Sequence, residues 1–294
     1  MKDLESLSAS QAIKALAKRE IRATDLLLSC LDRIGQRESV VKAWASLGKE
    51  NALSRAKSLD KGAFKGILHG LPIGVKDLFD TFDLPTSYGS SIYAHHYPST
   101  DAVSVALMRH AGAIILGKTV TTEFASFKSA PTTNPHNRSH TPGGSSSGSA
   151  AAVAAGIVPI ALGTQTVGSV IRPAAFCGVV GLKASYGAIP RAGVFPLSGS
   201  LDHVGFLARS VNDVAYAFNT LRNRLVEESD AIVLPAVPMD AKTGLAPSNP
   251  PRLAWLKTPF DDLVTAEQKE AMSQAVAAMR KSGAVVEEFS LPDA

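Results

Sequence analysis

From Leu68 onward the sequence alternates short apolar runs with stretches in which apolar residues recur at helical spacing. Strands that alternate with helices predict an α/β fold, with a mixed, largely parallel central sheet flanked by helices. A polar loop over 128–142 is expected to lead into a helix of small residues. The expected strands are 71–75, 113–116, 157–162, 179–182, 231–234, 253–256 and 284–289, and the expected helices are 101–111, 210–221 and 266–282.

The first sixty residues carry helical patterns without strands between them. Ser10 and Thr24 are the expected N-caps of the first two helices, because a hydroxyl oxygen can accept a bond from a free backbone amide of the first turn. A third helix is expected to end at Gly62. These patterns predict an N-terminal helical segment, 1–62, followed by an α/β part, 63–294.

Composition excludes several classes of protein. Apolar residues make up 45% of the 294 residues and charged residues 19%, whereas a disordered chain has low hydrophobicity and high charge. The 30 basic and 26 acidic residues give a formal net charge of +4 and are spread along the chain. A nucleic-acid partner is not expected, because such proteins usually show a basic stripe.

Cysteine content and apolar runs bear on location. Cys30 and Cys177 are too few for a disulfide framework and are expected to be free buried thiols in a reducing compartment. The polar N-terminus is unlike a signal peptide. The longest run of small apolar residues, 150–162, is shorter than the roughly 20 residues that span a bilayer. We therefore expect a cytoplasmic protein with no membrane partner.

One short motif suggests nucleotide binding. Residues 112–119 fit the phosphate-loop pattern G-x-x-x-x-G-K-[ST]. A phosphate cradle needs a flexible loop, and the central residues here, Ala-Ile-Ile-Leu, are typical of a strand. A core strand followed by a turn is the favoured interpretation.

A second motif, at 144–148, fits the nucleophile elbow G-x-S-x-G and would make Ser146 the nucleophile of an α/β-hydrolase. That motif requires a strand directly before it, and a loop precedes it here. A flexible Gly/Ser linker is another interpretation, which the apolar helical residues that follow disfavour.

Three residues from separate segments form a third candidate site: Lys76, Ser145 and Ser169. Taken singly, a lysine after a strand is usually solvated and a serine in a turn is usually a turn former. Together their segments resemble the amidase signature family, and the resemblance extends over about residues 5–222. The segments are Gly-Val-Lys-Asp (74–77), Ala-Ile-Ile-Leu-Gly-Lys-Thr (113–119), His-Thr-Pro-Gly-Gly-Ser-Ser-Ser-Gly-Ser (140–149) and Gly-Thr-Gln-Thr-Val-Gly-Ser-Val-Ile-Arg-Pro (163–173).

The resemblance implies a Ser-Ser-Lys catalytic triad. By motif position, Ser169 would be the nucleophile, Ser145 the bridging serine on a cis peptide, and Lys76 the base. A serine hydroxyl must lose its proton to a base before it attacks. A lysine can serve as that base once burial lowers its pKa. Asp77 is expected to point to the other side of the strand.

The family also implies an oxyanion hole, made of the backbone amides of Thr166, Val167, Gly168 and Ser169. The family motif has glycine where this chain has Val167. A β-branched residue would fit poorly if the backbone there had a positive φ, so Val167 is expected to be the main obstacle to activity.

Arg172 follows the expected nucleophile by three positions, within the Ser-Val-Ile-Arg-Pro that malonamidase-type members of the family share. Such members use this arginine for the free carboxylate of the substrate, which a guanidinium can bind through two hydrogen bonds. A structural salt bridge or a helix cap is the other interpretation of Arg172.

The resemblance thus implies an amidase that hydrolyses a small carboxylate-bearing primary amide, such as malonamate, through an acyl-enzyme, with no metal and no cofactor. A homodimer is suggested by resemblance alone. One alternative is an amidotransferase A-type subunit working with a partner, although its arginine usually lies one position earlier. Another is a non-catalytic relic, because family members run considerably longer and the C-terminal part of the family domain is expected to be missing.

Overall fold

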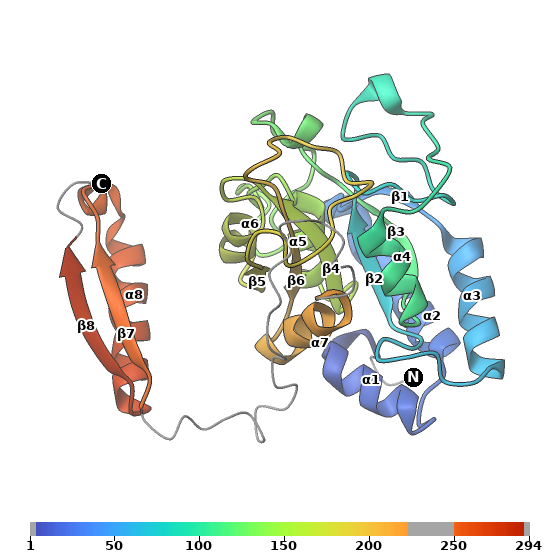
Figure 1. The fold of residues 1–294 in the computed structure, drawn as a ribbon, viewed down its shortest axis with the longest axis horizontal. Coiled ribbons are helices and arrows are strands. Elements are labelled where there is room, and N and C mark those ends of the chain that lie inside the picture. Colours follow the sequence, from blue (N-terminus) through green and yellow to red (C-terminus); the bar gives the residue numbers. More distant parts are fainter. Residues whose placement is uncertain (1–3, 223–249, 291–294) are drawn as a thin grey trace. The chain divides into compact units, whose positions relative to one another are not determined.

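The computed structural model describes residues 4–222 and 250–290, and the chain divides into two compact units, 1–239 and 240–294 (Figure 1). The first unit contains α1 (Ala9–Ala17), α2 (Ala23–Val41), β1 (Trp44–Leu47), α3 (Lys49–Lys61), β2 (Pro72–Lys76), α4 (Val103–His110), β3 (Ile114–Thr119), α5 (Ser147–Ala154), β4 (Ile160–Gln165), α6 (Ile171–Phe176), β5 (Val180–Lys183), β6 (His203–Ala208) and α7 (Val211–Leu221). Short 3-10 turns occupy Leu4–Ser6, Ser91–Tyr93 and Glu123–Ala125.

The first unit is built around a six-stranded sheet in the order β1-β3-β2-β4-β6-β5. The central strands β3, β2 and β4 are parallel, while β1 is antiparallel to β3, and β6 is antiparallel to both β4 and β5. Strands β2, β3 and β4 are buried along their whole length, as expected for parallel strands covered on both faces. The predicted α/β fold with a mixed, largely parallel sheet is confirmed.

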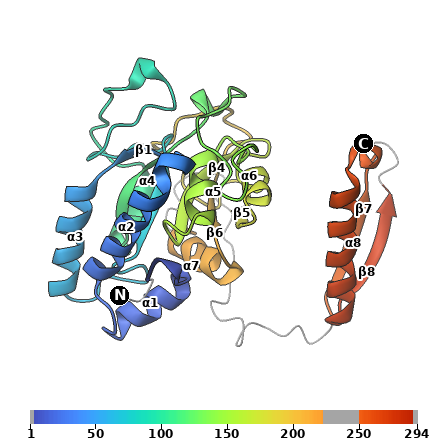
Figure 2. The ribbon, with the colours of Figure 1, turned by 180° about the vertical axis from the view of Figure 1, so that it is seen from behind.

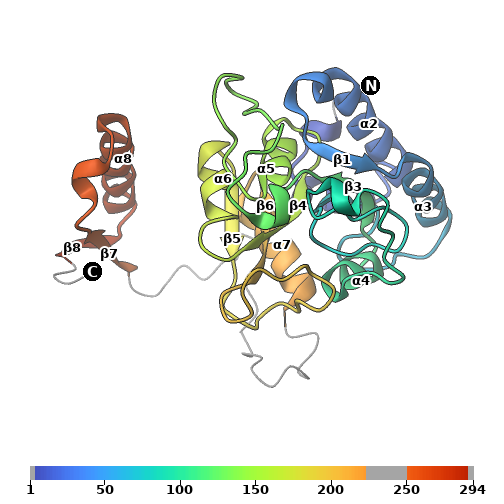
Figure 3. The same ribbon diagram turned by 90° about the horizontal axis from the view of Figure 1, so that it is seen from above.

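Helices cover both faces of this sheet. Helices α4 and α7 lie over the face that is turned to the viewer in Figure 1, whereas α2 and α5 lie over the opposite face, which Figure 2 shows from behind. Figure 3 shows both layers edge-on. Apolar side chains from α1–α3 and from the sheet share one core. The predicted boundary at residue 62 stays a prediction.

The close packing of helix α5 explains why the sequence there consists of small residues. A Cβ atom on Gly148 would lie 2.2 Å from the carbonyl oxygen of Ala43 and 2.4 Å from the amide nitrogen of Val120. The helix therefore packs directly on the backbone of Ala43 and Val120, and any side chain larger than that of glycine at residue 148 would prevent this contact. The Gly/Ser residues at 144–149 are buried and form the turn before α5 and its first residues, so they are no flexible linker.

The structure corrects both helix starts that were predicted near the N-terminus. Helix α1 is capped by Ser8, in a capping box with Gln11, and not by Ser10. The start of α2 has no cap from its own sequence; the carboxylate of Asp60 accepts from the amides of Ala23 and Thr24, at 2.7 and 3.1 Å. Local sequence cannot reveal this cap, because Asp60 belongs to another helix.

The second unit contains β7 (Arg252–Lys257), a 3-10 turn (Asp261–Leu263), α8 (Ala266–Lys281) and β8 (Val285–Ser290). Strands β7 and β8 pair in parallel, and Thr265 caps α8 through the amide of Gln268. The strand expected at 231–234 lies outside the described residues. No helix among the described residues is long and apolar enough to cross a membrane.

Candidate active site

Lys76 ends β2 at the carboxyl edge of the parallel strands, where α/β folds usually place their ligands. Its side chain is fully buried. The Nζ atom donates to Ser145 Oγ at 2.7 Å and to Thr164 Oγ1 at 2.7 Å. The structure thus joins two of the predicted site residues and adds Thr164, at the end of β4, as a second acceptor.

Burial lowers the pKa of Lys76 well below its usual 10.5, and the negative charge of Asp202 opposes part of this effect. Burial acts in this direction because a low-dielectric interior disfavours the ammonium form. The site therefore favours a neutral amine, which can accept a proton.

Ser145 lies in the turn that enters α5, and the peptide bond between Gly144 and Ser145 is cis, as the resemblance implies. The carbonyl of Ser145 accepts from the amide of Thr122 at 3.2 Å. The carbonyl of Gly144 accepts from Arg172 Nε at 3.1 Å and Nη2 at 2.7 Å. Arg172 thus holds the turn that carries Ser145, a contact that the sequence did not reveal.

Ser169 lies at the end of the turn between β4 and α6 and is 9% exposed. Its carbonyl accepts from the amide of Ser146 at 3.3 Å, which places it beside the Ser145 turn. In residues 4–222 and 250–290, no hydrogen bond engages the Ser169 hydroxyl. The nucleophile predicted from the motif is therefore near the Lys76–Ser145 pair, without a direct bond to Ser145.

The turn from Thr166 to Ser169 is braced from within. Gln165 accepts the amides of Val170 and Ile171 through Oε1, at 2.9 Å each, and its Nε2 donates to the carbonyl of Val167 at 3.2 Å. Among the hydrogen bonds of the described residues, none is donated by the amides of Thr166, Val167, Gly168 or Ser169. These amides are thus available as oxyanion donors, in the positions that the resemblance implies.

Val167 does not have the backbone conformation that would make a β-branched residue unfavourable. The non-glycine residues with positive φ in the described chain are Arg19, Lys42, Tyr88, Phe124 and Ala125. The Val167 side chain is 83% exposed and so points to solvent. The backbone misfit considered for Val167 is therefore absent.

Asp202 is another residue that sequence analysis did not identify. Its carboxylate accepts from the hydroxyl of Thr166 at 2.6 Å. It lies just before β6, a strand that the sequence analysis did not predict. Thr164, Thr166 and Asp202 line one cavity of about 250 Å³, together with mainly apolar residues of 191–199.

A second cavity of about 250 Å³ lies beside the Ser145 turn. Arg172, Gly144 and Phe127 are among its lining residues. A guanidinium has five N–H donors and two edges that can each bind an acceptor pair. Gly144 occupies the edge formed by Nε and Nη2, and no hydrogen bond among the described residues uses Nη1.

The nucleophile-elbow motif at 144–148 and the phosphate-loop motif at 112–119 do not have the geometry that their functions require. Ser146 is fully buried, and its hydroxyl is bonded to the backbone of Thr164, through the carbonyl at 3.2 Å and the amide at 3.3 Å. Residues 114–119 form the buried strand β3, paired on both sides, so they make no phosphate loop.

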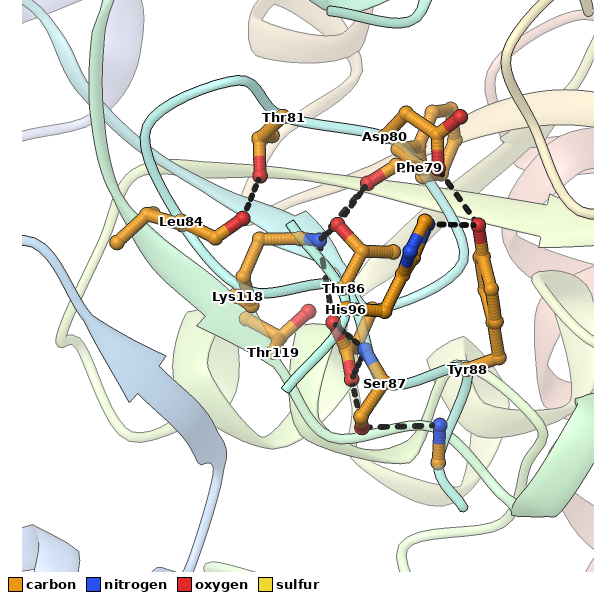
Figure 4. Close-up of polar contacts among 12 residues, drawn as sticks. Phe79, Asp80, Thr81, Leu84, Thr86, Ser87, Tyr88, His96, Lys118 and Thr119 are labelled. Atoms are coloured by element: carbon orange, nitrogen blue, oxygen red, sulfur yellow. Dashed lines mark hydrogen bonds and ion pairs between the residues drawn. The ribbon is translucent and has the colours of Figure 1, made fainter. Parts of the chain in front are cut away.

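Lys118, the lysine of that rejected loop, belongs to a buried polar network (Figure 4). Its Nζ donates to the carbonyl of Phe79 at 2.8 Å and to Thr86 Oγ1 at 2.7 Å, and it forms an ion pair of 3.1 Å with Asp77. Asp77 thus points away from Lys76, as expected. The network ties the chain that follows β2 to strand β3, next to Lys76.

Comparison with known proteins agrees with this geometry. Residues 25–294 match the family model described as Amidase. The chain is 40% identical over 294 residues to the A subunit of the glutamyl-tRNA(Gln) amidotransferase of Shouchella clausii (strain KSM-K16), covering 97% of this chain and 60% of that protein. The protein of the same name from Geobacillus sp. (strain WCH70) is 39% identical over 289 residues, covering 94% and 59%.

Among solved structures, the native peptide amidase from Stenotrophomonas maltophilia superposes with a TM-score of 0.86 at 32% identity, covering 98% of this chain and 62% of that chain. This chain spans about three-fifths of the length of the two amidotransferase subunits named above. Those relatives are amidotransferase subunits, so the malonamidase-type assignment drawn from Ser-Val-Ile-Arg-Pro gains no support from them.

Proposed function

Because this chain belongs to the amidase family, we propose that it hydrolyses the C–N bond of a primary amide through an acyl-enzyme on Ser169, releasing ammonia. The observation that carries the proposal is the 2.7 Å hydrogen bond between Lys76 Nζ and Ser145 Oγ in a fully buried setting. A buried amine with a lowered pKa beside a hydroxyl is the arrangement that serine activation requires.

In the proposed reaction, the lone pair of the neutral Lys76 amine accepts the hydrogen bond from Ser145 Oγ, the reverse of the bond that the ammonium form donates. Ser169 Oγ attacks the amide carbon as its proton passes to Ser145 Oγ, whose own proton passes to the Lys76 amine. The amides of Thr166, Val167, Gly168 and Ser169 are the proposed hydrogen-bond donors to the oxyanion. The proton then returns through Ser145 to the leaving ammonia, and water hydrolyses the ester by the same relay. Hydrogen bonds between catalytic groups are often long or absent until substrate binds. The absence of a hydrogen bond between Ser169 Oγ and Ser145 Oγ, both in the described part of the chain, is consistent with this behaviour.

The proposed substrate is a small amide with a free carboxylate, as in malonamate. Arg172 lines a cavity beside Ser145, and its Nη1 is not bonded to any residue in the described part of the chain. An arginine edge suits a carboxylate because two parallel hydrogen bonds match its geometry. No metal or organic cofactor is needed, since side chains and backbone amides fill each role.

Ammonia release from malonamate and from propionamide tests the proposal. Turnover is expected for the purified chain and lost in both Ser169→Ala and Lys76→Met. Ser146→Ala is the matched control, because it removes a neighbouring hydroxyl that serves only the backbone of β4. Equal turnover by Ser169→Ala and the unaltered chain would overturn the assignment.

A second candidate is a component of an assembly that delivers ammonia to a partner. The similarity to the A subunits of two amidotransferases, at 39–40% identity, favours it. In that case the isolated chain would leave malonamate intact, and turnover of an amide donor would require a co-purified partner. Light scattering on the isolated chain tests the expected homodimer, which would show twice the molar mass of one chain.

A further inference from the structure

Asp202 connects two loops that border the candidate active site. One carboxylate oxygen, Oδ1, accepts from the hydroxyl of Thr166 at 2.6 Å. The other, Oδ2, accepts from the amides of Leu197 and Ser198, at 2.8 and 2.9 Å. Thr166 opens the turn that ends at Ser169, so this carboxylate anchors the oxyanion turn to the loop before β6.

The same carboxylate shares a cavity with a hydrogen-bond partner of Lys76. Asp202 and Thr164 line one cavity, and Thr164 Oγ1 is the second acceptor of Lys76 Nζ. The charge of Asp202 raises the pKa of Lys76, in opposition to the larger effect of burial. Through a cavity wall of low polarity, such a charge acts more strongly than it would in water.

Other titratable or charged groups lie on the elements around Asp202 and Lys76. Arg191 Nη1 donates to the carbonyls of Gly199, at 2.8 Å, and of Asp202 itself, at 3.4 Å, and the guanidinium lies 4.6 Å from the ring centre of Tyr186. His203 Nδ1 bonds the carbonyl of Leu201 at 2.7 Å. On the strand next to β2, Lys118 is paired with Asp77. The charge of Asp202 opposes the effect of burial on the pKa of Lys76, and the paired charges of Lys118 and Asp77 offset one another.

We propose that Asp202 is a positioning residue for the amide hydrolysis proposed above: its carboxylate fixes the oxyanion turn through Thr166 and places a negative charge in the cavity that Thr164, the second acceptor of Lys76 Nζ, also lines. The two roles are separable. The hydrogen bond needs an acceptor at Oδ1, whereas the electrostatic effect needs a negative charge.

Three variants separate these roles. Asp202→Asn removes the charge and keeps one acceptor oxygen, for Thr166; its NH2 group cannot accept from the amides of Leu197 and Ser198 as Oδ2 does. Thr166→Val keeps the charge and removes the hydroxyl donor. Asp202→Glu keeps the charge and is the conservative rescue. Asp32→Asn, on the exposed side of α2, is the matched control for loss of one carboxylate.

The pH profile of kcat/KM is the first readout. Asp202→Asn is expected to move the acid limb to lower pH, because a lost negative charge favours the neutral amine. Thr166→Val is expected to lower kcat about tenfold, the effect of one lost hydrogen bond, with the acid limb unmoved. Asp202→Glu should return the limb toward its original position, and Asp32→Asn should change neither quantity.

The second readout does not depend on turnover. The pKa of Lys76 is measured by NMR on protein labelled with ¹³C-lysine, with the resonance assigned from Lys76→Met, in the unaltered chain and in Asp202→Asn. A lower pKa in Asp202→Asn is expected. An unchanged pKa would overturn the inference, even if the chain hydrolyses amides. Absent turnover with a lowered pKa would instead contradict the proposed function and leave the electrostatic role of Asp202 intact.

Discussion

Lys76 Nζ donates a hydrogen bond of 2.7 Å to Ser145 Oγ where both side chains are buried. The residues come from a strand end and from a helix start that are 69 positions apart. Their proximity results from α5 packing closely on the sheet, which its glycine and alanine residues permit.

This pair predicts the pH dependence of the reaction. Burial lowers the pKa of Lys76 below its usual 10.5, and only the neutral amine accepts the Ser145 proton. Activity should therefore rise with pH through the lowered pKa of Lys76 and reach its plateau below pH 10.5. A kcat/KM profile checks this sign. An activity that falls as pH rises through neutrality would show that a protonated group drives the rate.

Arg172 should affect both the geometry of the site and the choice of substrate. In Arg172→Met the carbonyl of Gly144 loses two donors, so kcat is expected to fall about tenfold for propionamide and malonamate alike. For malonamate, KM should rise in addition, about 10- to 100-fold, through the lost charge-assisted contact. Steady-state kinetics with both amides separate the effects. An equal change in KM for the two substrates would remove the carboxylate role and leave the structural one.

Val167→Gly should change little in catalysis. Val167 is exposed and outside the positive-φ set, so a glycine relieves no strain. Activity is expected to stay within about twofold, as for other surface substitutions. The free energy of unfolding should fall by about 0.5–1 kcal/mol, because glycine has more freedom in the unfolded chain. Kinetics and urea denaturation test this. A large gain in turnover would mean that valine distorts the oxyanion turn after all.

The buried pair of Lys118 and Asp77 should matter for stability. Asp77→Asn leaves the Lys118 ammonium without its counter-charge, at a cost of about 3–5 kcal/mol in the free energy of unfolding. The double variant Asp77→Asn with Lys118→Met should be less unstable than Asp77→Asn alone, because no uncompensated charge remains. Denaturant titration of Asp77→Asn, of Lys118→Met and of the double variant gives the three losses in the free energy of unfolding that are compared. Additive losses would show that the two side chains are not coupled.

Sequence patterns predicted those parts of the fold that depend on local periodicity. The strands predicted at 71–75 and 113–116 correspond to β2 and β3 of the structure. Both predicted runs are apolar throughout, which is a local signal of a buried strand. Strand β6 was missed, since its six residues follow a long irregular loop and their role, pairing antiparallel to both β4 and β5, depends on distant chain. The cap of α2 by Asp60 was missed for the same reason.

The candidate site shows the same division. Motif resemblance identified Lys76 and Ser145, which the structure joins directly. It could not reveal that Thr164 is the second acceptor of Lys76, or that Arg172 bonds Gly144, because hydrogen-bond partners across a fold have no local signature. The concern over Val167 depended on a φ angle that residue types do not determine.

The central claim is that Ser169 is activated by the Lys76–Ser145 pair. Labelling with a small fluorophosphonate, followed by intact-mass analysis and peptide mapping, tests it without knowledge of the substrate. The account predicts one adduct on Ser169, which is lost in Lys76→Met and kept in Ser146→Ala. An adduct on Ser146, or no adduct on the folded chain, would contradict it.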